Sequence, residues 1–289
     1  MTLRTPTILA GLAFTLATLS GGAAAQSYPT KPIRMILTYS GGIEAIARLM
    51  AQRLSESLGQ PVLVEGQAGA GGSIGATTVA KAAPDGHTIL STTGSTQVQR
   101  GFLIRNVPYD PVKDFTPITL SWETMIVIGA SNGAPFSNFR EMIAYAKANP
   151  GKISYGTSGL GTSHHLALEQ INLLAGINMV HIPYKGGDQV ITDVIAGRIQ
   201  ASSSPLFSLE PSVSAGKARY LAVLNSRRFE GVPDVPSVRE VIPGFDAPPL
   251  WSGFFGPPGL PQSIVSRLHG EITRIAATTE VKARLFAGG

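Results

Sequence analysis

The chain has 289 residues, which favours two domains with separate hydrophobic cores over one. It contains no cysteine, so disulfides, thiol catalysis and a cysteine zinc site are excluded. Its 23 basic and 18 acidic residues give a net charge of +5 without a basic cluster among aromatic residues, so nucleic acid is not an expected partner.

Residues 1–25 have the pattern of a secretory signal peptide. Arg4 precedes the apolar run ILAGLAFTLATLSGG, and Ala23 and Ala25 stand at the spacing that a signal peptidase recognises. We therefore predict cleavage after Ala25 and a periplasmic location. An uncleaved membrane anchor is the alternative, although no later apolar stretch approaches the length that spans a bilayer.

The first third of the mature chain alternates between strand-like and helix-like segments, which predicts an α/β fold with mainly parallel sheets. The helix expected at residues 44–59 has one apolar face and ends at Gly59. The glycines of residues 69–75 have the spacing GxGxxxG rather than the dinucleotide-binding GxGxxG, so we interpret them as a tight turn with close helix packing. Strands are expected at residues 32–39, 61–65 and 87–92.

The pattern restarts after a proline-rich, extended segment, residues 107–122, which we interpret as a crossing into a second domain. Asn138, with Glu141 three residues later, is expected to cap the first helix there. Strands are expected at residues 125–130, 153–156, 179–184, 199–202 and 218–224, with helices at 163–176 and 188–197.

A strand at residues 251–256 and a helix at 261–277 look like a return to the first domain. The chain would then cross twice between two α/β lobes, an arrangement that opens and closes by hinge motion around a central cleft. The prediction is a two-domain, Venus-flytrap fold. Domain 1 comprises residues 26–124 and 248–289, and domain 2 comprises residues 125–247.

The stretch YGTSGLGTSHHLALEQINLL is the first candidate for a binding loop. It runs from a strand through two glycines to a helix start, with hydroxyl groups on both sides. Backbone amides, hydroxyls and the positive end of the helix dipole would together hold an anion such as a carboxylate. The alternative is that Thr162 or Ser163 merely caps the helix. The candidate ligand-binding residues are Ser158, Gly159, Gly161, Thr162 and Ser163.

Two further loops have a similar design. TYSGGIEAIA also joins a strand to a helix and offers Ser40, Gly41, Gly42 and Glu44, while STTGSTQ follows the strand at residues 87–92. Loops at the carboxyl ends of strands in α/β sheets meet at ligand sites, so the three are expected to converge on one cleft. Glu44 either complements the helix dipole or binds an amino or hydroxyl group of the ligand.

Catalytic and metal sites are poorly supported. Ser158 lies in Gly-Thr-Ser-Gly-Leu, which fails the GxSxG nucleophile elbow, and a serine hydrolase using it with His164 or His165 lacks an evident acid partner. The two histidines diverge by about 100° on a helix and cannot chelate one metal from one face. We expect one packed and one exposed ring, no metal, no cofactor and no enzymatic activity.

The motifs together resemble the Bug family, the periplasmic solute receptors of tripartite tricarboxylate transporters. The resemblance rests on YPTKPIRMI, GQPVLVEGQAGAGGSIGATTVAKAAPDGHTIL, PYDPVKDFTPIT, AKANPGKISYGTSGLGTSHHLA, HIPYKG, AGKARYLAV and VPDVPSVRE. It implies a Venus-flytrap receptor that binds a small organic carboxylate, often through ordered waters, and delivers it to membrane permease subunits. We expect such a receptor to be a monomer.

The resemblance also implies which residues form the binding loops. The first loop corresponds to Tyr39 through Glu44 and the second to Ser158 through Ser163, while Gly94 and Ser95 match a third. Glu44 stands where the family usually has aspartate, and TYSGGIE is shorter than the usual PFPAGGGTD.

Two further departures leave alternatives open. Gly-Gln-Ala follows Glu65 in place of Asn-Arg-Pro, and the sequence ends at RLFAGG, where relatives continue through a further strand and helix. The open alternatives are a truncated or degenerate receptor, or a ligand-sensing adaptor for a membrane sensor kinase.

Overall fold

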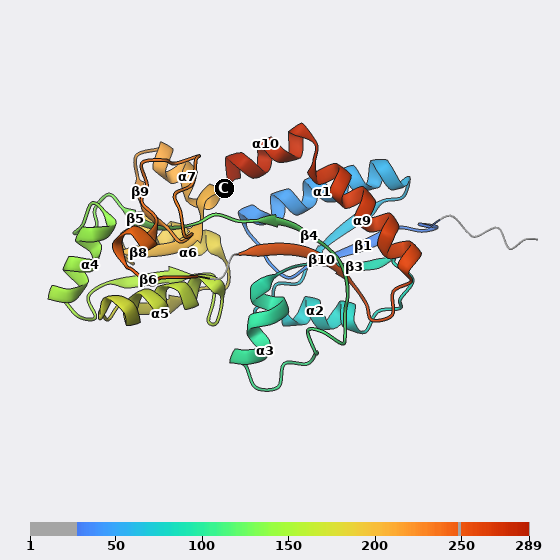
Figure 1. Cartoon of the computed structure of the whole chain (residues 1–289), viewed down its shortest axis with the longest axis horizontal. Coiled ribbons are helices and arrows are strands. Elements are labelled where there is room, and N and C mark those ends of the chain that lie inside the picture. The colour runs from blue at the N-terminus through green and yellow to red at the C-terminus, as the bar shows by residue number, and fades with distance from the viewer. Residues whose placement is uncertain (1–27, 248–249, 289) are drawn as a thin grey trace, which may run out of the picture.

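The structure is a computed structural model that describes residues 28–247 and 250–288. It contains two lobes, each built on a five-stranded sheet with helices on both faces (Figure 1). The first sheet has the order β2-β1-β3-β10-β4 and the second β7-β6-β8-β5-β9. The strands of the first sheet are β1 (Ile33–Leu37), β2 (Val62–Gly66), β3 (Thr88–Thr93), β4 (Thr116–Glu123) and β10 (Trp251–Gly256). Those of the second are β5 (Ile126–Ser131), β6 (Ser154–Thr157), β7 (Val180–Pro183), β8 (Ala201–Pro205) and β9 (Ala218–Val223).

The expected α/β class is confirmed, and four of the five strands in each sheet run in the same direction, but each sheet also contains one antiparallel strand that was not expected. β1 pairs in parallel with β2 and β3, and β6 does so with β7 and β8. β10 instead runs antiparallel to β3 and β4, and β5 runs antiparallel to β8 and β9. β10 and β5 are the strands that enter each lobe from the other, and hydrophobic periodicity carries no information about strand direction.

The first lobe packs helices against both faces of its sheet. The helices of this lobe are α1 (Gly42–Leu58), α2 (Ser73–Ala80), α3 (Arg100–Leu103), α9 (Gln262–Ala276) and α10 (Thr279–Gly288), with a π-helical turn η1 (Ser95–Gln99) before α3. Successive side chains of β1 point to opposite faces of the sheet. Met35 packs in the core with α1 and α9, and Ile36 packs with Val79 of α2 on the other face. Gly59 ends α1 in the left-handed conformation, at φ 71°, as predicted.

The second lobe has the same layered plan. Its helices are α4 (Phe139–Ala148), α5 (Ser163–Ala175), α6 (Gly187–Ile195), α7 (Leu206–Ser214) and α8 (Val238–Val241). Phe139 of α4 and Leu168 of α5 belong to the core on one face of the sheet, and Leu209 of α7 belongs to the core on the other. The Glu141 amide donates to Asn138 Oδ1 at 3.0 Å, so the predicted cap of α4 is confirmed.

Several elements differ from the sequence expectation, among them η1, α3 and α8, which were not predicted. Residues expected as a crossing segment form β4, an edge strand of the first sheet in which Ile118 and Trp122 are buried and Leu120 is exposed. The helices α7 and α10 were not expected. α7 contains Pro211 and three serines, a composition that is typical of a loop, and it forms because the burial of Leu206 and Leu209 outweighs that propensity.

The lobes are joined where the chain passes from β4 to β5 and returns to β10. The Thr124 amide donates to the Leu250 carbonyl at 2.7 Å, so the two crossing segments are hydrogen-bonded to each other. Residues 248–249, where the predicted domain 1 resumes, and the whole predicted signal peptide lie outside the described residues. Within residues 28–247 and 250–288, no helix has the length and apolar character to cross a membrane.

Candidate functional site

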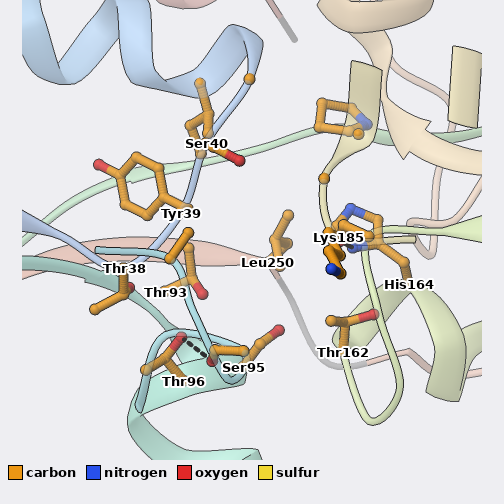
Figure 2. A pocket seen from close by; sticks show the side chains of 18 of the residues that line it. Thr38, Tyr39, Ser40, Thr93, Ser95, Thr96, Thr162, His164, Lys185 and Leu250 are labelled. Atoms are coloured by element: carbon orange, nitrogen blue, oxygen red, sulfur yellow. Dashed lines mark hydrogen bonds between the residues drawn. The ribbon is translucent and has the colours of Figure 1, made fainter. Parts of the chain in front are cut away.

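A cavity of about 110 Å³ lies between the lobes (Figure 2). Its walls come from the carboxyl ends of β1 and β3 in the first lobe and from those of β6, β7 and β8 in the second. Six of the residues proposed from sequence line it: Tyr39, Ser40, Gly41, Ser95, Ser158 and Thr162. The cavity therefore brings together residues from all three of the expected loops.

The other sequence candidates take up positions around this cavity. Gly42 begins α1, and Glu44 in its first turn accepts hydrogen bonds from Arg48. That ion pair fits the interpretation of Glu44 as a complement to the helix dipole. Gly94 packs under Trp251, since a Cβ there would lie 2.8 Å from the indole Nε1. The remaining three candidates, Gly159, Gly161 and Ser163, lie in the second loop.

The backbone of the second loop is mostly satisfied within the protein. The Gly159 amide donates to Thr157 Oγ1 at 3.3 Å and the Gly161 amide donates to His165 Nδ1 at 3.2 Å. The Ser163 amide donates to Ser95 Oγ at 3.1 Å. These three amides therefore bind other groups of the protein, whereas the sequence interpretation had them bind the ligand. Side chains of the loop face the cavity in their place.

The sequence alternative that Thr162 caps α5 agrees with the structure. Thr162 is the N-cap residue, and its Oγ1 accepts a hydrogen bond from the His165 amide at 3.3 Å. The same hydroxyl donates to the Gly159 carbonyl at 2.9 Å. Thr162 thus closes the loop upon itself while also lining the cavity.

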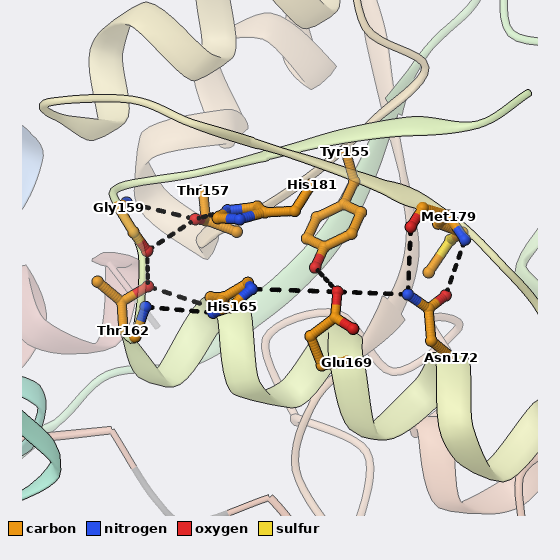
Figure 3. Close-up of polar contacts among 10 residues, drawn as sticks. Tyr155, Thr157, Gly159, Thr162, His165, Glu169, Asn172, Met179 and His181 are labelled. Carbon is orange, nitrogen blue, oxygen red and sulfur yellow. Dashed lines mark hydrogen bonds and ion pairs between the residues drawn. The ribbon is translucent and has the colours of Figure 1, made fainter. Parts of the chain in front are cut away.

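A polar network behind the second loop fixes its shape (Figure 3). The His181 ring stacks on His165 with centroids 4.0 Å apart, and its Nε2 lies 2.7 Å from Thr157 Oγ1. Tyr155 donates to Glu169, which also lies 4.0 Å from His165 Nε2. The expectation of one exposed histidine is therefore wrong, because His165 is held in this stack. Burial lowers the pKa of His165 and that of His181, the latter to about 4.

The first loop presents a different surface to the cavity. Gly41 is the N-cap of α1, with φ 88° and no side-chain cap, and the amides of Gly41 and Ile43 have no partner among the described residues. Both residues line the cavity. The positive end of the α1 dipole therefore borders the cavity beside the Asp188 carboxylate, whose Oδ1 would lie 3.2 Å from a Cβ at Gly41.

The two lobes touch directly beside the cavity. Ser95 Oγ lies 3.0 Å from Ser163 Oγ, and Ser163 Oγ donates to Gln99 Oε1 at 3.0 Å. Together with the Ser163 amide, these contacts join the start of α5 to η1. We call this set, Ser95, Gln99 and Ser163, the serine latch. It holds the lobes in the closed arrangement that encloses the cavity.

Ser163→Ala is expected to favour the open arrangement. The variant loses the hydroxyl bonds to Ser95 and Gln99, a loss of about 1–2 kcal/mol that lowers ligand affinity roughly 5- to 30-fold. Small-angle scattering of the free protein should give a larger radius of gyration, and titration calorimetry should give a weaker affinity. Ser266→Ala on the exposed face of α9 is the control. Wild-type compactness and affinity in Ser163→Ala would rule out the latch.

One charged residue is found among the described residues that line the cavity, and the sequence analysis did not select it. Lys185 follows β7 and lines the cavity, and it makes no ion pair or hydrogen bond with any described residue. No acidic side chain is found among the described lining residues. The position of Lys185 at the carboxyl end of a parallel strand, before Gly186 and Gly187, was the sequence signal that could have identified it.

Several hydroxyl groups on the cavity wall are also free to form hydrogen bonds with a ligand. Tyr39 is hydrogen-bonded to Ser91 Oγ at 2.7 Å, and Thr96 donates to the Gly71 carbonyl at 3.1 Å, so both are already occupied. Three lining hydroxyls have no hydrogen-bond partner within residues 28–247 and 250–288: those of Ser40, Thr93 and Ser208. An ammonium and three free hydroxyls suit a small oxyanion.

Ser158 and His164 line the cavity and form a contact that resembles a nucleophile and its base. Ser158 Oγ lies 3.3 Å from His164 Nδ1. Nε2 of the same ring has no partner, so no acid orients it, and burial lowers the pKa of His164 to about 4, which makes it a weak base at neutral pH. This geometry does not favour a serine hydrolase. Within the described residues, no cluster of three or more histidine, cysteine or acidic side chains could hold a metal.

Acidification is expected to destabilise the protein between about pH 6.5 and pH 4. The pKa of His164 falls from 6.5 in the unfolded chain to about 4 in the fold, so the unfolded chain binds more protons in this window. The stabilisation is complete above pH 6.5 and is lost as the pH falls, by at most on the order of 3 kcal/mol. Urea unfolding at several pH values measures it, with His164→Gln expected to give a shallower slope. Equal slopes in both proteins would contradict the assignment.

The fold and the cavity together define a two-lobed solute-binding protein. The family model described as "Tripartite tricarboxylate transporter family receptor" matches residues 46–288. The chain belongs to this family of receptors, which places it among binding proteins rather than enzymes and confirms the resemblance to Bug proteins.

Three similar proteins support the assignment. A "UPF0065 protein in tcbD-tcbE intergenic region" of Pseudomonas sp. (strain P51) is 36% identical over 279 residues, covering 95% of this chain and 82% of that protein. The structure of the periplasmic binding protein BugD is 30% identical, covers 90% of this chain and 87% of its own, and has a TM-score of 0.83. MatC from Rhodopseudomonas palustris with bound malate is 29% identical, covers 90% of each chain, and also has a TM-score of 0.83.

Proposed function

We propose that the protein is an extracytoplasmic receptor that captures a small organic carboxylate between its lobes. It then delivers this acid to the membrane permease subunits of a tripartite tricarboxylate-type transporter. The observation that carries the proposal is Lys185, an unpaired cation on the wall of a cavity whose described lining contains no acid. The similar structure of MatC has malate bound, which is a small organic carboxylate.

The carboxylate is placed by charge and by hydrogen bonds. Lys185 forms a charge-assisted hydrogen bond with it, and the free hydroxyls of Ser40, Thr93 and Ser208 provide further donors. The amino end of α1 borders the cavity as well, but the neighbouring Asp188 carboxylate offsets its positive potential. Other parts of the cavity wall are formed by Tyr39, Ser95, Ser158 and Thr162.

The residues that the sequence suggested but that do not line the cavity help to hold the shape of the binding loops. Gly159 and Gly161 take φ values of 141° and 73°, which favour glycine, and Ser163 belongs to the serine latch. Gly94 allows Trp251 to pack closely. Gly42 and Glu44 belong to the amino end of α1, whose dipole Glu44 complements.

The two domains that we propose correspond to the two sheets. Domain 1 comprises residues 26–124 and 248–289 and domain 2 residues 125–247, with the hinge at the bonded crossing segments. The receptor works as a monomer in the periplasm after cleavage behind Ala25.

Titration calorimetry of the purified protein tests the proposal. A panel of mono-, di- and tricarboxylates, with the matching amides and a set of sugars as controls, should yield at least one acid that binds while its amide does not. At 100 times its Kd, such an acid stabilises the fold by about 2.7 kcal/mol, which a thermal scan detects. If the folded protein gave no binding signal with any acid of the panel, the proposal would be overturned.

A further inference from the structure

A second cavity, of about 590 Å³, lies in the first lobe between α2 and the segment that follows α3 (Figure 1). A volume of this size is typical of sites for small organic ligands. Ser73, Thr77 and Lys81 are spaced four residues apart, so one face of α2 forms one wall, and Ile104 and Val107 belong to the other. We call this cavity the α2 groove. It shares no lining residue, among those described, with the cavity between the lobes.

The α2 groove contains two cations without a counter-ion. Arg100 is partly buried, and its Nε donates to Ser73 Oγ at 2.9 Å. The guanidinium occupies space that Gly71 leaves open, because a Cβ there would lie 2.0 Å from Arg100 Nη1. Within residues 28–247 and 250–288, neither Arg100 nor Lys81 forms an ion pair, and no acidic side chain lines the groove. The guanidinium is therefore held in place with its charge available to a ligand.

Two residues of the α2 groove have an unusual backbone conformation. Ala70 and Asn106, at φ values of 52° and 63°, are the non-glycine residues of the described chain that have a positive φ, and both line the groove. The left-handed conformation is unfavourable for a residue with a Cβ, and more so for alanine than for asparagine. Residues held in such conformations cluster at ligand-binding sites. Their meeting at one groove therefore supports a binding role for it.

We propose that the α2 groove is a second binding site, which takes a soluble organic anion with an oxyanion such as phosphate on an apolar body. Arg100 and Lys81 bind the oxyanion, because a fixed guanidinium and an ammonium suit a group with several acceptor oxygens. The apolar body packs against Ile74, Ile104 and Val107. This site is separate from the cavity between the lobes, and the inference does not depend on the proposed function.

The walls of the α2 groove favour an anion that also has apolar surface. Ile74 is a large apolar side chain that is 55% exposed, and an apolar body would cover it. The hydroxyls of Thr77 and Thr78 already donate to the Ser73 carbonyl and to Gln67 Oε1, so the donors that remain are mainly the two cations. Charge and apolar area together should therefore select an amphipathic anion over a free inorganic one.

Phenyl phosphate is the probe that tests the site by titration calorimetry. We expect it to bind the purified protein with a Kd of roughly 1 mM or less. Inorganic phosphate lacks the apolar body and should bind about tenfold more weakly. Benzyl alcohol lacks the charge and should give no measurable binding. If phenyl phosphate did not bind, or bound no better than inorganic phosphate, the proposal would be overturned.

Two substitutions locate the probe on the cations of the α2 groove. R100Q should weaken phenyl phosphate binding about 10- to 150-fold. K81E changes an exposed lysine, so it should fold even if R100Q does not, and it should weaken binding about tenfold. K217E, at an exposed lysine of the second lobe, is the matched control and should bind the probe as the wild type does. Thermal unfolding identifies the folded variants. Unchanged affinity in folded K81E, or an equal loss in K217E, would contradict the proposal.

Two further comparisons separate the α2 groove from other places where the probe could bind. K185Q should keep the wild-type affinity for phenyl phosphate, because Lys185 lines only the cavity between the lobes. A loss in K185Q equal to that in R100Q would place the probe in that cavity and overturn the proposal. Vesicles of phosphatidylglycerol, compared with vesicles of phosphatidylcholine, test a lipid headgroup as the source of the oxyanion. The protein should stay in solution with both, and sedimentation with the anionic vesicles that R100Q abolishes would overturn the assignment to a soluble ligand.

Discussion

Lys185→Gln is expected to weaken carboxylate binding about 10- to 150-fold while leaving the fold intact. The substitution removes the one unpaired cation from a cavity that has no acid among its described lining residues. A hydrogen bond to a charged group contributes about 1.5–3 kcal/mol, which corresponds to this change in affinity. Lys185 forms no ion pair in the described structure, so its loss should leave the free energy of unfolding nearly unchanged.

Lys152→Gln provides the matched control for this charge change. Lys152 is an exposed lysine in the turn after α4, away from the cavity. Titration calorimetry of both variants with one acid at two salt concentrations separates a local contact from a general effect of net charge. An equal loss of affinity in both variants would show that Lys185 is not the anchor.

Gly72→Ala is expected to destabilise the protein by about 2–5 kcal/mol and to weaken binding. Gly72 has a φ of 89°, and an added Cβ would lie 2.8 Å from Thr38 Cβ and also press on Thr96. The backbone conformation accounts for about 1–2 kcal/mol and the overpacking for about 1–3 kcal/mol. Thr38 and Thr96 line the cavity, so the shift they must make should also weaken binding. Urea unfolding and calorimetry measure the two effects.

Gly244→Ala separates the two contributions. Gly244 has a similar φ of 83°, but nothing lies within 4 Å of an added Cβ. The control should therefore lose only the part of the stability that comes from the backbone conformation, and its ligand affinity should stay at the wild-type value. If Gly72→Ala were no less stable than Gly244→Ala, close packing at Gly72 would not matter.

The sequence was informative where local chemistry decides structure. Most of the strands, the longer helices α1 and α5, the Asn138 cap and the left-handed stop at Gly59 follow from spacing and residue type, and the structure contains them. The family was also within reach, because its motifs run through most of the chain. Each of these features depends on a few neighbouring residues.

Features that depend on distant parts of the chain were harder to predict. The direction of β5 and β10 follows from the two crossings between lobes, to which hydrophobic periodicity is insensitive. From the sequence, we expected the amides of the second loop to be free for a ligand. The Ser163 amide instead donates to the hydroxyl of Ser95, which is 68 residues away in the chain. Lys185 was not selected from the sequence despite its place between a strand and two glycines, because a lysine there is more often simply solvated, and the cavity shows where it lies.

These placements change how the two loops share the work of binding. In the second loop, three amides that the sequence suggested for anion binding are used to hold the loop and the serine latch. The first loop brings the amino end of α1 to the cavity, and the second lobe contributes a cation through Lys185.

A crystal structure of the protein with the tightest-binding acid of the calorimetric panel tests the central claim most directly. We predict density for the acid between the lobes, with one carboxylate oxygen within hydrogen-bonding distance of Lys185 Nζ and the serine latch formed. An acid bound outside the cavity, or bound within it while Lys185 points into solvent, would contradict the account.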